Sequence, residues 1–262
     1  MFQPVIPVGG LGGWRFLQRT YDAQFVAFSQ SVEIKRDSDY FREKVGGVQS
    51  AEELVSDRRL LTVALGAFGL QDDIDNRYFI KKILEDGTEN DDALANRFAD
   101  TRYRELSEAF GFGPTEFPKT SQQDFVESVL ARYEASSFEL ATGAQDESMR
   151  FALYGQREMS LVAKMEGSND TKWFTVMGDP PLRKLFERAL NLPDAFGQVD
   201  IDQQLAVFKD RASSIFGSAD LGQFEDPDKL QGLITKYLVG EQISSLGQGL
   251  SSGSIALTLL GR

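Results

Sequence analysis

The chain has 262 residues, of which 40 are Asp or Glu and 28 are Lys or Arg, so its net charge is −12. This balance argues against a nucleic-acid partner, which needs a basic surface; it mainly favours solubility, although a basic protein partner is compatible with it. The chain contains no Cys and no His. Their absence excludes disulfides, zinc sites built on these residues, haem ligation by His, iron–sulfur clusters, Cys nucleophiles and triads with an imidazole base.

The N-terminal segment, residues 1–13, is rich in Gly and Pro and predicts a flexible arm. Its Gly cluster lacks the Gly-Lys-Ser/Thr ending of a phosphate-binding loop. The segment has neither a basic start nor a long apolar stretch, which argues against a secretory signal peptide. No apolar run reaches the ~20 residues of a membrane span. We therefore expect a cytoplasmic protein without membrane insertion.

A long helical stretch is predicted over residues 14–45. Its aromatic residues Trp14, Tyr21 and Phe28 are spaced seven apart and share one face. Such a face forms either a seam for a partner helix or a surface that packs on the protein's own body, and the second use is the more common. The candidate partner-binding residues on this face are Trp14, Leu17, Tyr21, Phe25 and Phe28.

A short pattern occurs three times, at residues 57–70, 100–112 and 179–192. Each copy opens with Asp, continues through one apolar helical stripe and ends with Gly or Asn followed by an apolar residue. The opening Asp suits a helix N-cap. The closing Gly or Asn suits a left-handed residue just beyond the helix, and the next residue suits the apolar contact of a Schellman motif. The pattern predicts capped amphipathic helices.

The first and third copies suggest an internal duplication. They begin at Asp57 and Asp179 and align without a gap at an offset of 122 residues, which also carries Asp72 onto Asp194. The alternative is that capped amphipathic helices resemble one another by convergence. We interpret the chain as two related helical halves.

Further amphipathic helices are predicted over residues 77–85, 121–135, 146–166, 200–215 and 228–246. The Gly- and Pro-containing stretch 111–119 is the best candidate boundary. The expected organisation is an all-α fold of nine or ten helices, an irregular helical repeat or bundle, either in two domains or in one compact domain. Its parts are an arm at 1–13, an N-terminal half at 14–118, a C-terminal half at 119–246 and a Gly/Ser-rich tail at 247–262.

The tail alternates Ile255, Leu257 and Leu259, a strand-like pattern. Such a tail either docks on its own domain or adds to a partner's structure.

Side chains that could carry catalysis form no recognisable site. The acidic stretch 86–92 is out of register with a calcium-binding loop and is typical of an ordinary turn. Ser160 and Lys164 are four residues apart on one helix, a spacing that is common by chance. A pair of carboxylates distant in sequence stays open as a catalytic alternative. We predict no catalytic, cofactor-binding or metal-binding residues, and no cofactor.

Several strings carry a resemblance that covers nearly the whole chain. They include GWRFLQRTY at 13–21, ALANRF at 93–98, RFALY at 150–154 and MGDPPL at 177–182. On these strings the chain resembles the domain of unknown function 1217 family of alphaproteobacteria. The resemblance implies a helical protein whose genes lie among flagellar and motility genes, and it supplies no catalytic residues.

These observations lead us to expect a non-catalytic structural or interaction protein associated with flagellar biogenesis or motility, with a protein partner such as a flagellar component. Export with the flagellar apparatus, as an axial or rod-associated component, is an alternative to a cytoplasmic location. The alternative function is a carboxylate-based enzyme or a small-ligand-binding protein with a cleft between the halves. The sequence does not indicate an oligomeric state.

Overall fold

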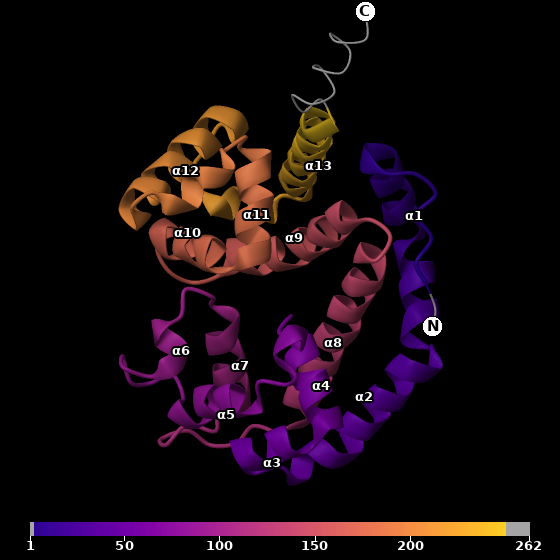
Figure 1. The fold of residues 1–262 in the computed structure, drawn as a ribbon, viewed down its shortest axis with the longest axis vertical. Helices are drawn as coiled ribbons and strands as arrows, with labels where there is room; N and C mark the ends of the chain where they lie inside the picture. Colours follow the sequence, from indigo (N-terminus) through magenta and orange to yellow (C-terminus); the bar gives the residue numbers. More distant parts are fainter. Residues whose placement is uncertain (1–2, 250–262) are drawn as a thin grey trace, which may run out of the picture. The chain divides into compact units, whose positions relative to one another are not determined.

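The computed structural model describes residues 3–249 and shows an all-α fold (Figure 1). Thirteen α-helices and four short 3-10 helices make up the regular structure of these residues, which contain no strand. The predicted fold class is therefore confirmed. The helix number exceeds the expected nine or ten for two reasons. The expected stretch 14–45 is two helices, and three short helices, at Ala51–Ser56, Leu94–Arg97 and Asn169–Gly178, lack the long apolar stripe that periodicity detects.

The chain forms two compact units. Within the described residues, unit 1 consists of residues 3–5 and Leu17–Gln145, and unit 2 consists of Ile6–Phe16 and residues 146–249. The first helix, α1, spans Gly10–Ser29 and contributes residues to both units.

Unit 1 contains seven further α-helices and two 3-10 helices. They are α2 (Val32–Lys44), η1 (Val45–Gly47), α3 (Ala51–Ser56), α4 (Arg58–Ala67), η2 (Gln71–Asp73), α5 (Arg77–Asp86), α6 (Leu94–Arg97), α7 (Arg102–Phe110) and α8 (Gln123–Gly143).

Unit 2 contains five α-helices and two 3-10 helices. They are α9 (Glu147–Lys164), α10 (Asn169–Gly178), α11 (Pro180–Ala189), η3 (Asp194–Gln198), α12 (Ile201–Phe216), η4 (Leu221–Glu225) and α13 (Pro227–Gly249).

The division between the units falls after Gln145, not at the expected position between 118 and 119. Helix α8 packs against α4 and α2, so it belongs to unit 1. The Gly- and Pro-containing stretch 111–119 is an internal connection of that unit, where the Lys119 amide donates to the Phe110 carbonyl at 3.1 Å. The Gly and Pro residues correctly indicate a loop here, but the tertiary packing of α8 determines where the unit ends.

The two units repeat one arrangement of helices. In unit 1, α4 packs against α2, α3 and α8, and in unit 2, α11 packs against α9, α10 and α13. In each unit the helix at the centre of these contacts begins at an Asp whose carboxylate also accepts a bond from a Tyr hydroxyl of a preceding long helix. These pairs are Tyr40 with Asp57 and Tyr154 with Asp179. Because capped helices alone would not reproduce this tertiary pairing, it supports duplication over convergence.

The helix starts predicted from the repeated pattern are confirmed in its first and third copies. The Asp57 carboxylate accepts the Leu60 amide at 3.1 Å, and the Asp179 carboxylate accepts the Leu182 amide at 2.8 Å. Pro180 occupies the first turn of α11, where a missing N–H costs no helical bond.

The predicted helix ends are also confirmed. Gly69, Gly111 and Asn191 all have positive φ, and Asn191 is the single non-Gly residue with positive φ in the described part of the chain. The Leu70 amide donates back to the Leu65 carbonyl and the Leu192 amide to the Glu187 carbonyl, both at 2.8 Å. These are the bonds of a Schellman motif.

Pro4 and Val5, near the start of the N-terminal segment, are bonded to other residues of unit 1, in contrast to the expected flexible arm. The side chain of Gln24 accepts the Val5 amide at 2.6 Å and donates to the Val5 carbonyl at 3.2 Å. Gln145 donates to the Pro4 carbonyl. Helix α1 then begins at Gly10, four residues earlier than expected. These side-chain bonds come from residues far away in sequence, so local composition could not reveal them.

The Gly cluster of this segment serves close packing. A Cβ atom on Gly13 would lie 1.9 Å from the backbone oxygen of Val8, a distance that the structure cannot accommodate without moving the backbone. We expect Gly13→Ala to lower the free energy of unfolding by about 1–3 kcal/mol through overpacking. Urea denaturation followed by circular dichroism measures this change.

Gly232→Ala is the matched control. Gly232 lies within α13, and a Cβ atom added to it would have no neighbouring atom within 4 Å. Here Ala should stabilise the helix by up to about 1 kcal/mol. Equal effects of the two substitutions would contradict the close-packing role of Gly13.

The expected tail begins later than residue 247, because α13 continues to Gly249. The strand-like positions Ile255, Leu257 and Leu259 lie outside the described residues.

Candidate functional site

The aromatic face of α1 packs on the protein itself. Trp14, Leu17 and Phe28 are 1%, 0% and 3% exposed, and Tyr21 and Phe25 are half-buried. These five residues, which the sequence suggested as a partner-binding face, are therefore not an open surface in this structure. The candidate site lies elsewhere.

The centre of this packing is Phe138 of α8, a residue of unit 1. The rings of Tyr21, Phe25 and Phe28 meet it edge-on, with centroid distances of 5.4–5.6 Å. The heptad spacing of α1 thus serves an intramolecular contact, which is the more common use of an apolar helix face.

Other chemistry suggested by the sequence finds little geometric support. The Ser160 hydroxyl donates to the Gln156 carbonyl at 2.9 Å, a local helix bond, and Lys164 is exposed. Over residues 3–249, no three acidic side chains are grouped closely enough to hold a metal ion. None of the helices in this range has the length and apolar character needed to cross a bilayer.

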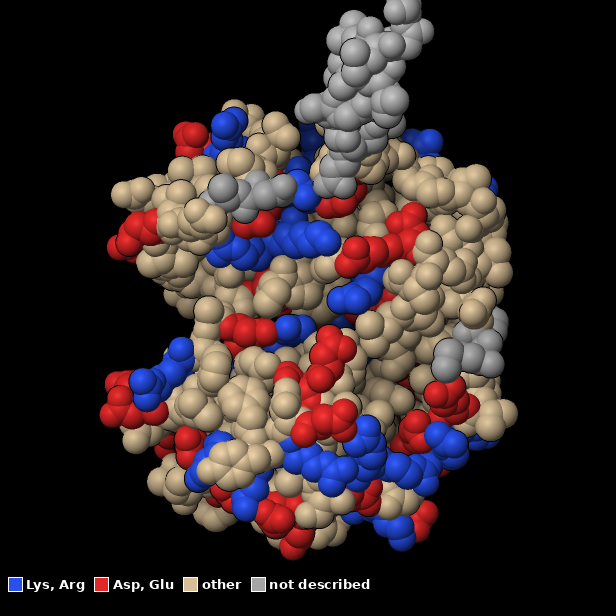
Figure 2. Space-filling model, in the orientation of Figure 1, with Lys and Arg blue, Asp and Glu red and all other residues tan. Residues whose placement is uncertain are grey.

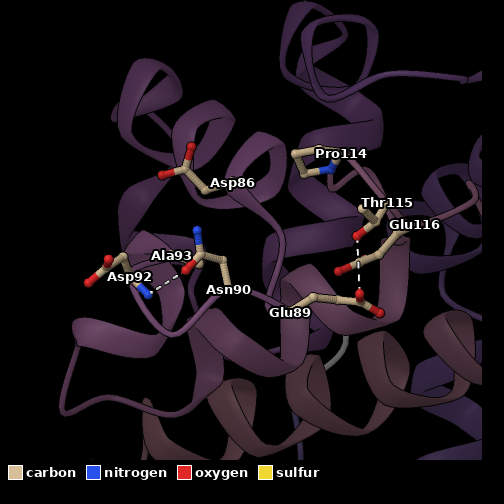
Figure 3. Close-up of a pocket in the computed structure, with 8 residues that line it drawn as sticks. All are labelled: Asp86, Glu89, Asn90, Asp92, Ala93, Pro114, Thr115 and Glu116. Atoms are coloured by element: carbon tan, nitrogen blue, oxygen red, sulfur yellow. Dashed lines mark hydrogen bonds between the residues drawn. The ribbon is translucent and has the colours of Figure 1, made fainter.

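Acidic and basic side chains are interspersed on the face shown in Figure 2. Within unit 1, however, one cavity of about 500 Å³ has a lining with carboxylates and no Lys or Arg. Figure 3 shows Asp86, Asn90 and Asp92 on one side of it and Pro114, Thr115 and Glu116 on the other. The complete lining is Asp86, Glu89, Asn90, Asp92, Ala93, Pro114, Thr115 and Glu116.

Two loops build this cavity because two glycines let them approach. Gly87 ends α5 with a φ of +67°, and a Cβ atom on it would lie 2.9 Å from the Cα atom of Gly113. A side chain at either position would push the loops apart. The chain therefore brings residues 86–93 and 114–116 together although they are distant in sequence.

Hydrogen bonds hold both walls of the cavity. The Glu116 carboxylate accepts the Thr88 amide at 3.2 Å. The Thr115 hydroxyl donates to the Glu89 carboxylate at 3.1 Å (Figure 3). The side-chain amide of Asn96 donates to two backbone carbonyls of the first loop, at 2.8 and 2.9 Å. The cavity is thus formed by the protein's own bonds.

All residues that line the cavity except Asp86 belong to a part of unit 1 that we call the α6–α7 lobe, defined as residues 87–122. This lobe connects α5 to α8. Near its end Thr120 is buried and donates to the Val48 carbonyl at 2.7 Å. Phe117, next in sequence to the cavity residue Glu116, is 85% exposed, the highest value among the exposed large apolar residues of the described chain. A phenylalanine this exposed on a fixed loop is a candidate contact for a partner.

Carboxylates in this setting bind cationic groups. Four of the eight lining residues are Asp or Glu, and Glu89 and Asp92 are solvent-exposed. Exposed carboxylates remain hydrated, which suits reversible contact with a cation. The cavity can therefore accept an ammonium or guanidinium group.

A second cavity of unit 1, of about 510 Å³, lies along α2 beside Arg59. Its lining is mixed, with the cations Lys35, Arg36 and Arg59 alongside Asp39 and Glu43. Because side chains of opposite charge are neighbours here, the cavity has no excess of positive or negative charge that would select a charged ligand.

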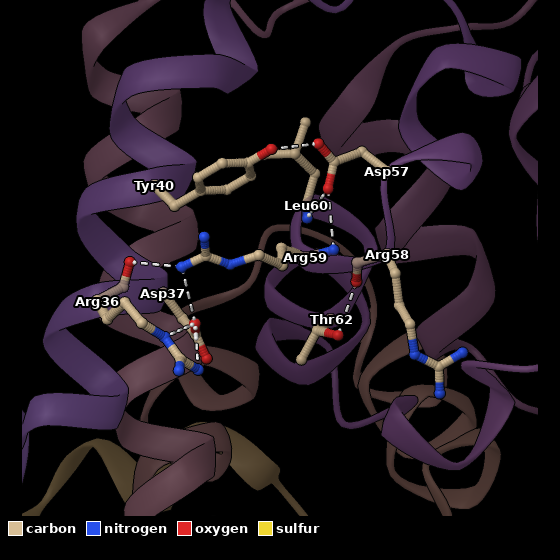
Figure 4. A network of polar contacts seen from close by, with 8 residues as sticks. All are labelled: Arg36, Asp37, Tyr40, Asp57, Arg58, Arg59, Leu60 and Thr62. Carbon is tan, nitrogen blue, oxygen red and sulfur yellow. Dashed lines mark hydrogen bonds and ion pairs between the residues drawn. The ribbon is translucent and has the colours of Figure 1, made fainter.

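The polar network beside this second cavity is structural (Figure 4). The Tyr40 hydroxyl donates to Asp57 at 2.6 Å, and the Arg59 guanidinium lies 4.1 Å from the centre of the Tyr40 ring. Burial alone would raise the pKa of Asp57, but the bonds from Tyr40 and from the Leu60 and Arg59 amides outweigh it, so that this pKa lies below its ordinary value.

Tyr40→Phe should lower the free energy of unfolding by about 1 kcal/mol at pH 7, because Asp57 loses a hydrogen bond to its charged form. A depressed carboxyl pKa stabilises the fold above the unfolded-state pKa, near 4, and this contribution is lost as the pH falls through the folded-state pKa. The difference between wild type and variant should thus shrink below about pH 4. Urea titrations at a series of pH values measure it, and a difference that grows in acid would contradict this role.

Comparisons with known proteins agree with the fold. Residues 67–230 match the family model described as "Protein of unknown function (DUF1217)". The chain belongs to this family. A crystal structure of a structural-genomics target from Agrobacterium tumefaciens is similar to it, with a TM-score of 0.74 and 24% sequence identity over 92% of this chain and 99% of the other. At this identity the similarity shows the shared fold. No curated protein matches the chain.

Sequence reasoning did not find the cavity. Residues 86–92 have the composition of an ordinary acidic turn, and the Gly and Pro residues of 111–119 indicate a boundary. The available signal was the string ALANRF at 93–98, because Asn96 holds the acidic loop in place. That string carried the family resemblance without indicating its structural role.

Proposed function

We propose that the protein is a non-catalytic interaction protein that binds a protein partner through the α6–α7 lobe. The observation that carries this proposal is the difference between the two repeated units. Unit 1 connects α5 to α8 through residues 87–122, whereas unit 2 connects α12 to α13 through residues 217–226. The lobe is therefore an addition to a scaffold that unit 2 completes without it.

The short connection of unit 2 serves packing. Its 3-10 helix η4 contacts α9, α10 and α13, and its residues Leu221 and Phe224 are buried. The lobe of unit 1 also packs, through Leu106 and Phe110, but it exposes Phe117 and the cavity as well. A segment that exceeds the needs of packing and presents an exposed aromatic side chain is well suited to binding.

We further propose that the partner is a component of the flagellar apparatus. Membership of the family supports this proposal, because the resemblance implies genes that lie among flagellar and motility genes. The proposed location is the cytoplasm, with export alongside the flagellar apparatus as the alternative.

A pull-down from the native bacterium during flagellar assembly tests the proposal. Tagged wild type and Phe117→Ser are compared by mass spectrometry, with Tyr78→Ser as the control, because Tyr78 is 75% exposed on α5, outside the lobe. We expect flagellar components with wild type and with the control, and their loss with Phe117→Ser. Recovery of the same proteins with wild type and both variants, or of no flagellar component with any of them, would contradict the proposal.

A carboxylate-based enzyme or small-ligand-binding protein is the second candidate. The carboxylate-lined cavity favours it, here inside unit 1 and not at a cleft between halves. Screening the purified chain against small cationic compounds and glycosides separates the candidates. Turnover, or tight binding of a small compound that is lost in Glu116→Gln, would favour this second function.

A further inference from the structure

We infer that the α6–α7 lobe binds a protein segment that carries a Lys or Arg next to an apolar residue, the cation entering the cavity and the apolar side chain packing on Phe117. This inference rests on the proposed interaction function and names the chemistry of its partner. It is carried by charge complementarity together with the exposed aromatic residue at the same loop.

The charge of the cavity lining selects a cation. Residues 86–96 contain no Lys or Arg, and three of their four carboxylates, those of Asp86, Glu89 and Asp92, belong to residues that line the cavity. Across the cavity, Glu116 adds a carboxylate from the second loop. A partner with acidic side chains would meet like charge at both walls, whereas Lys or Arg would meet opposite charge, which steers encounter and excludes wrong partners.

The apolar features of the lobe select a protein segment over a simple cation. Phe117 is 85% exposed, and Pro114 and Ala93 contribute apolar surface to the cavity itself. A free polyamine would use the carboxylates alone. A peptide with an aromatic or aliphatic residue beside its cation would also cover Phe117, and buried aromatic contacts carry much of the binding energy in protein interfaces.

The cavity is formed before binding. Its loops are joined at Gly87 and Gly113 and bonded through Glu116, Thr115 and Asn96. A segment that docks here therefore orders little of the lobe. A flexible loop loses conformational entropy when it becomes ordered on binding, which weakens affinity. A preformed site avoids this loss.

The test titrates the full chain with three synthetic peptides, followed by NMR of backbone amides and by fluorescence anisotropy. The probes carry Lys-Phe-Lys, Lys-Gly-Lys or Glu-Phe-Glu between flanking glycines. We expect the Lys-Phe-Lys peptide to bind most tightly, to lose affinity as salt is added, and to shift amides of residues 87–93 and 115–117. The Glu-Phe-Glu peptide should not bind.

Two neighbouring acidic residues give a matched pair of variants. Asp92 lines the cavity, whereas Asp91 is exposed in the same loop and does not line it. Asp92→Asn should weaken binding of the Lys-Phe-Lys peptide about threefold to fivefold, the value of one ion pair. Asp91→Asn removes the same net charge and should leave binding within about twofold of wild type.

Absence of binding by the Lys-Phe-Lys peptide, equal binding of all three peptides, or equal effects of the two Asp variants would overturn the inference. The proposed function fails separately. If the pull-down recovers flagellar components that depend on Phe117 while Asp92→Asn changes neither that recovery nor peptide binding, the interaction function stands and the cationic partner chemistry is wrong.

Discussion

Phe138→Ala should destabilise the protein strongly, by about 3–5 kcal/mol of unfolding free energy. Phe138 is 0% exposed and lies among the rings of Tyr21, Phe25 and Phe28. Truncation removes a buried aromatic ring and leaves a cavity whose lining cannot collapse fully. Edge-to-face pairs add about 0.5–1.5 kcal/mol each beyond the area they bury. Urea denaturation followed by circular dichroism measures the loss.

Phe117→Ala is the control for this substitution, because it removes the same ring from a side chain that is 85% exposed. Its unfolding free energy should stay within about 0.5 kcal/mol of wild type. If both substitutions destabilise equally, or if Phe138→Ala changes stability by less than about 1 kcal/mol, the role of Phe138 as the centre of the α1–α8 contact is wrong.

Asp179→Ala should lower the free energy of unfolding by about 2–4 kcal/mol. The loss has two parts: the helix loses its N-cap, and the Tyr154 hydroxyl loses its hydrogen-bond acceptor. Asp179 is 4% exposed, caps α11 through the Leu182 amide and accepts the Tyr154 hydroxyl. Burial, and next to it the Asp179 and Glu158 carboxylates, raise the pKa of Tyr154 well above its ordinary value, so that the hydroxyl keeps its proton and must donate. The Ala variant leaves that donor without this acceptor. Thermal and urea unfolding measure the loss.

Asp179→Asn separates the two contributions. Asn is a good N-cap and offers a neutral oxygen to Tyr154, so this variant should keep at least half of the stability that Ala loses. In unit 1, Asp57→Ala should also lower the free energy of unfolding, but by less than Asp179→Ala does, since Asp57 is only half-buried. Equal losses for Asp179→Asn and Asp179→Ala would show that charge, and not capping, dominates this site.

The helix ends of the repeated pattern were predictable because they depend on neighbouring residues. An Asp that bonds amides two or three residues later, and a left-handed Gly or Asn followed by an apolar residue, act within one turn. In the second copy the predicted helix start differs from the observed one by a single residue. There α7 starts at Arg102 after Thr101, one residue later than expected, although the Asp100 carboxylate still accepts the Arg102 amide at 3.1 Å.

The extent of the long N-terminal helix was only partly predictable. The expected stretch 14–45 is two helices, α1 and α2, separated at Gln30 and Ser31, and Ser31 has extended backbone dihedrals. Apolar spacing continues across this break, so periodicity alone does not reveal it. Ser29 and Ser31 flank the break, and Ser favours helix ends. These residues are the local signal for the break, but the continuous apolar spacing predicts a single helix.

Features that depend on distant residues could not be predicted from the sequence. The position of α8 in unit 1, the attachment of Val5 by Gln24 and the meeting of Gly87 with Gly113 all join segments that are separate in the chain. The candidate cavity belongs to this class. Its acidic loop was visible, but without the second loop it had the composition of a solvated turn.

Site-specific photo-crosslinking from position 117 in the living bacterium tests most directly whether the α6–α7 lobe is the partner-binding surface. A photoreactive phenylalanine analogue replaces Phe117 in one strain and Tyr78 in another, since both side chains are well exposed. We predict a covalent adduct with a flagellar protein from position 117 and none from position 78. An adduct from position 78 alone, or none from either position in motile cells, would contradict the assignment of the lobe as the binding surface.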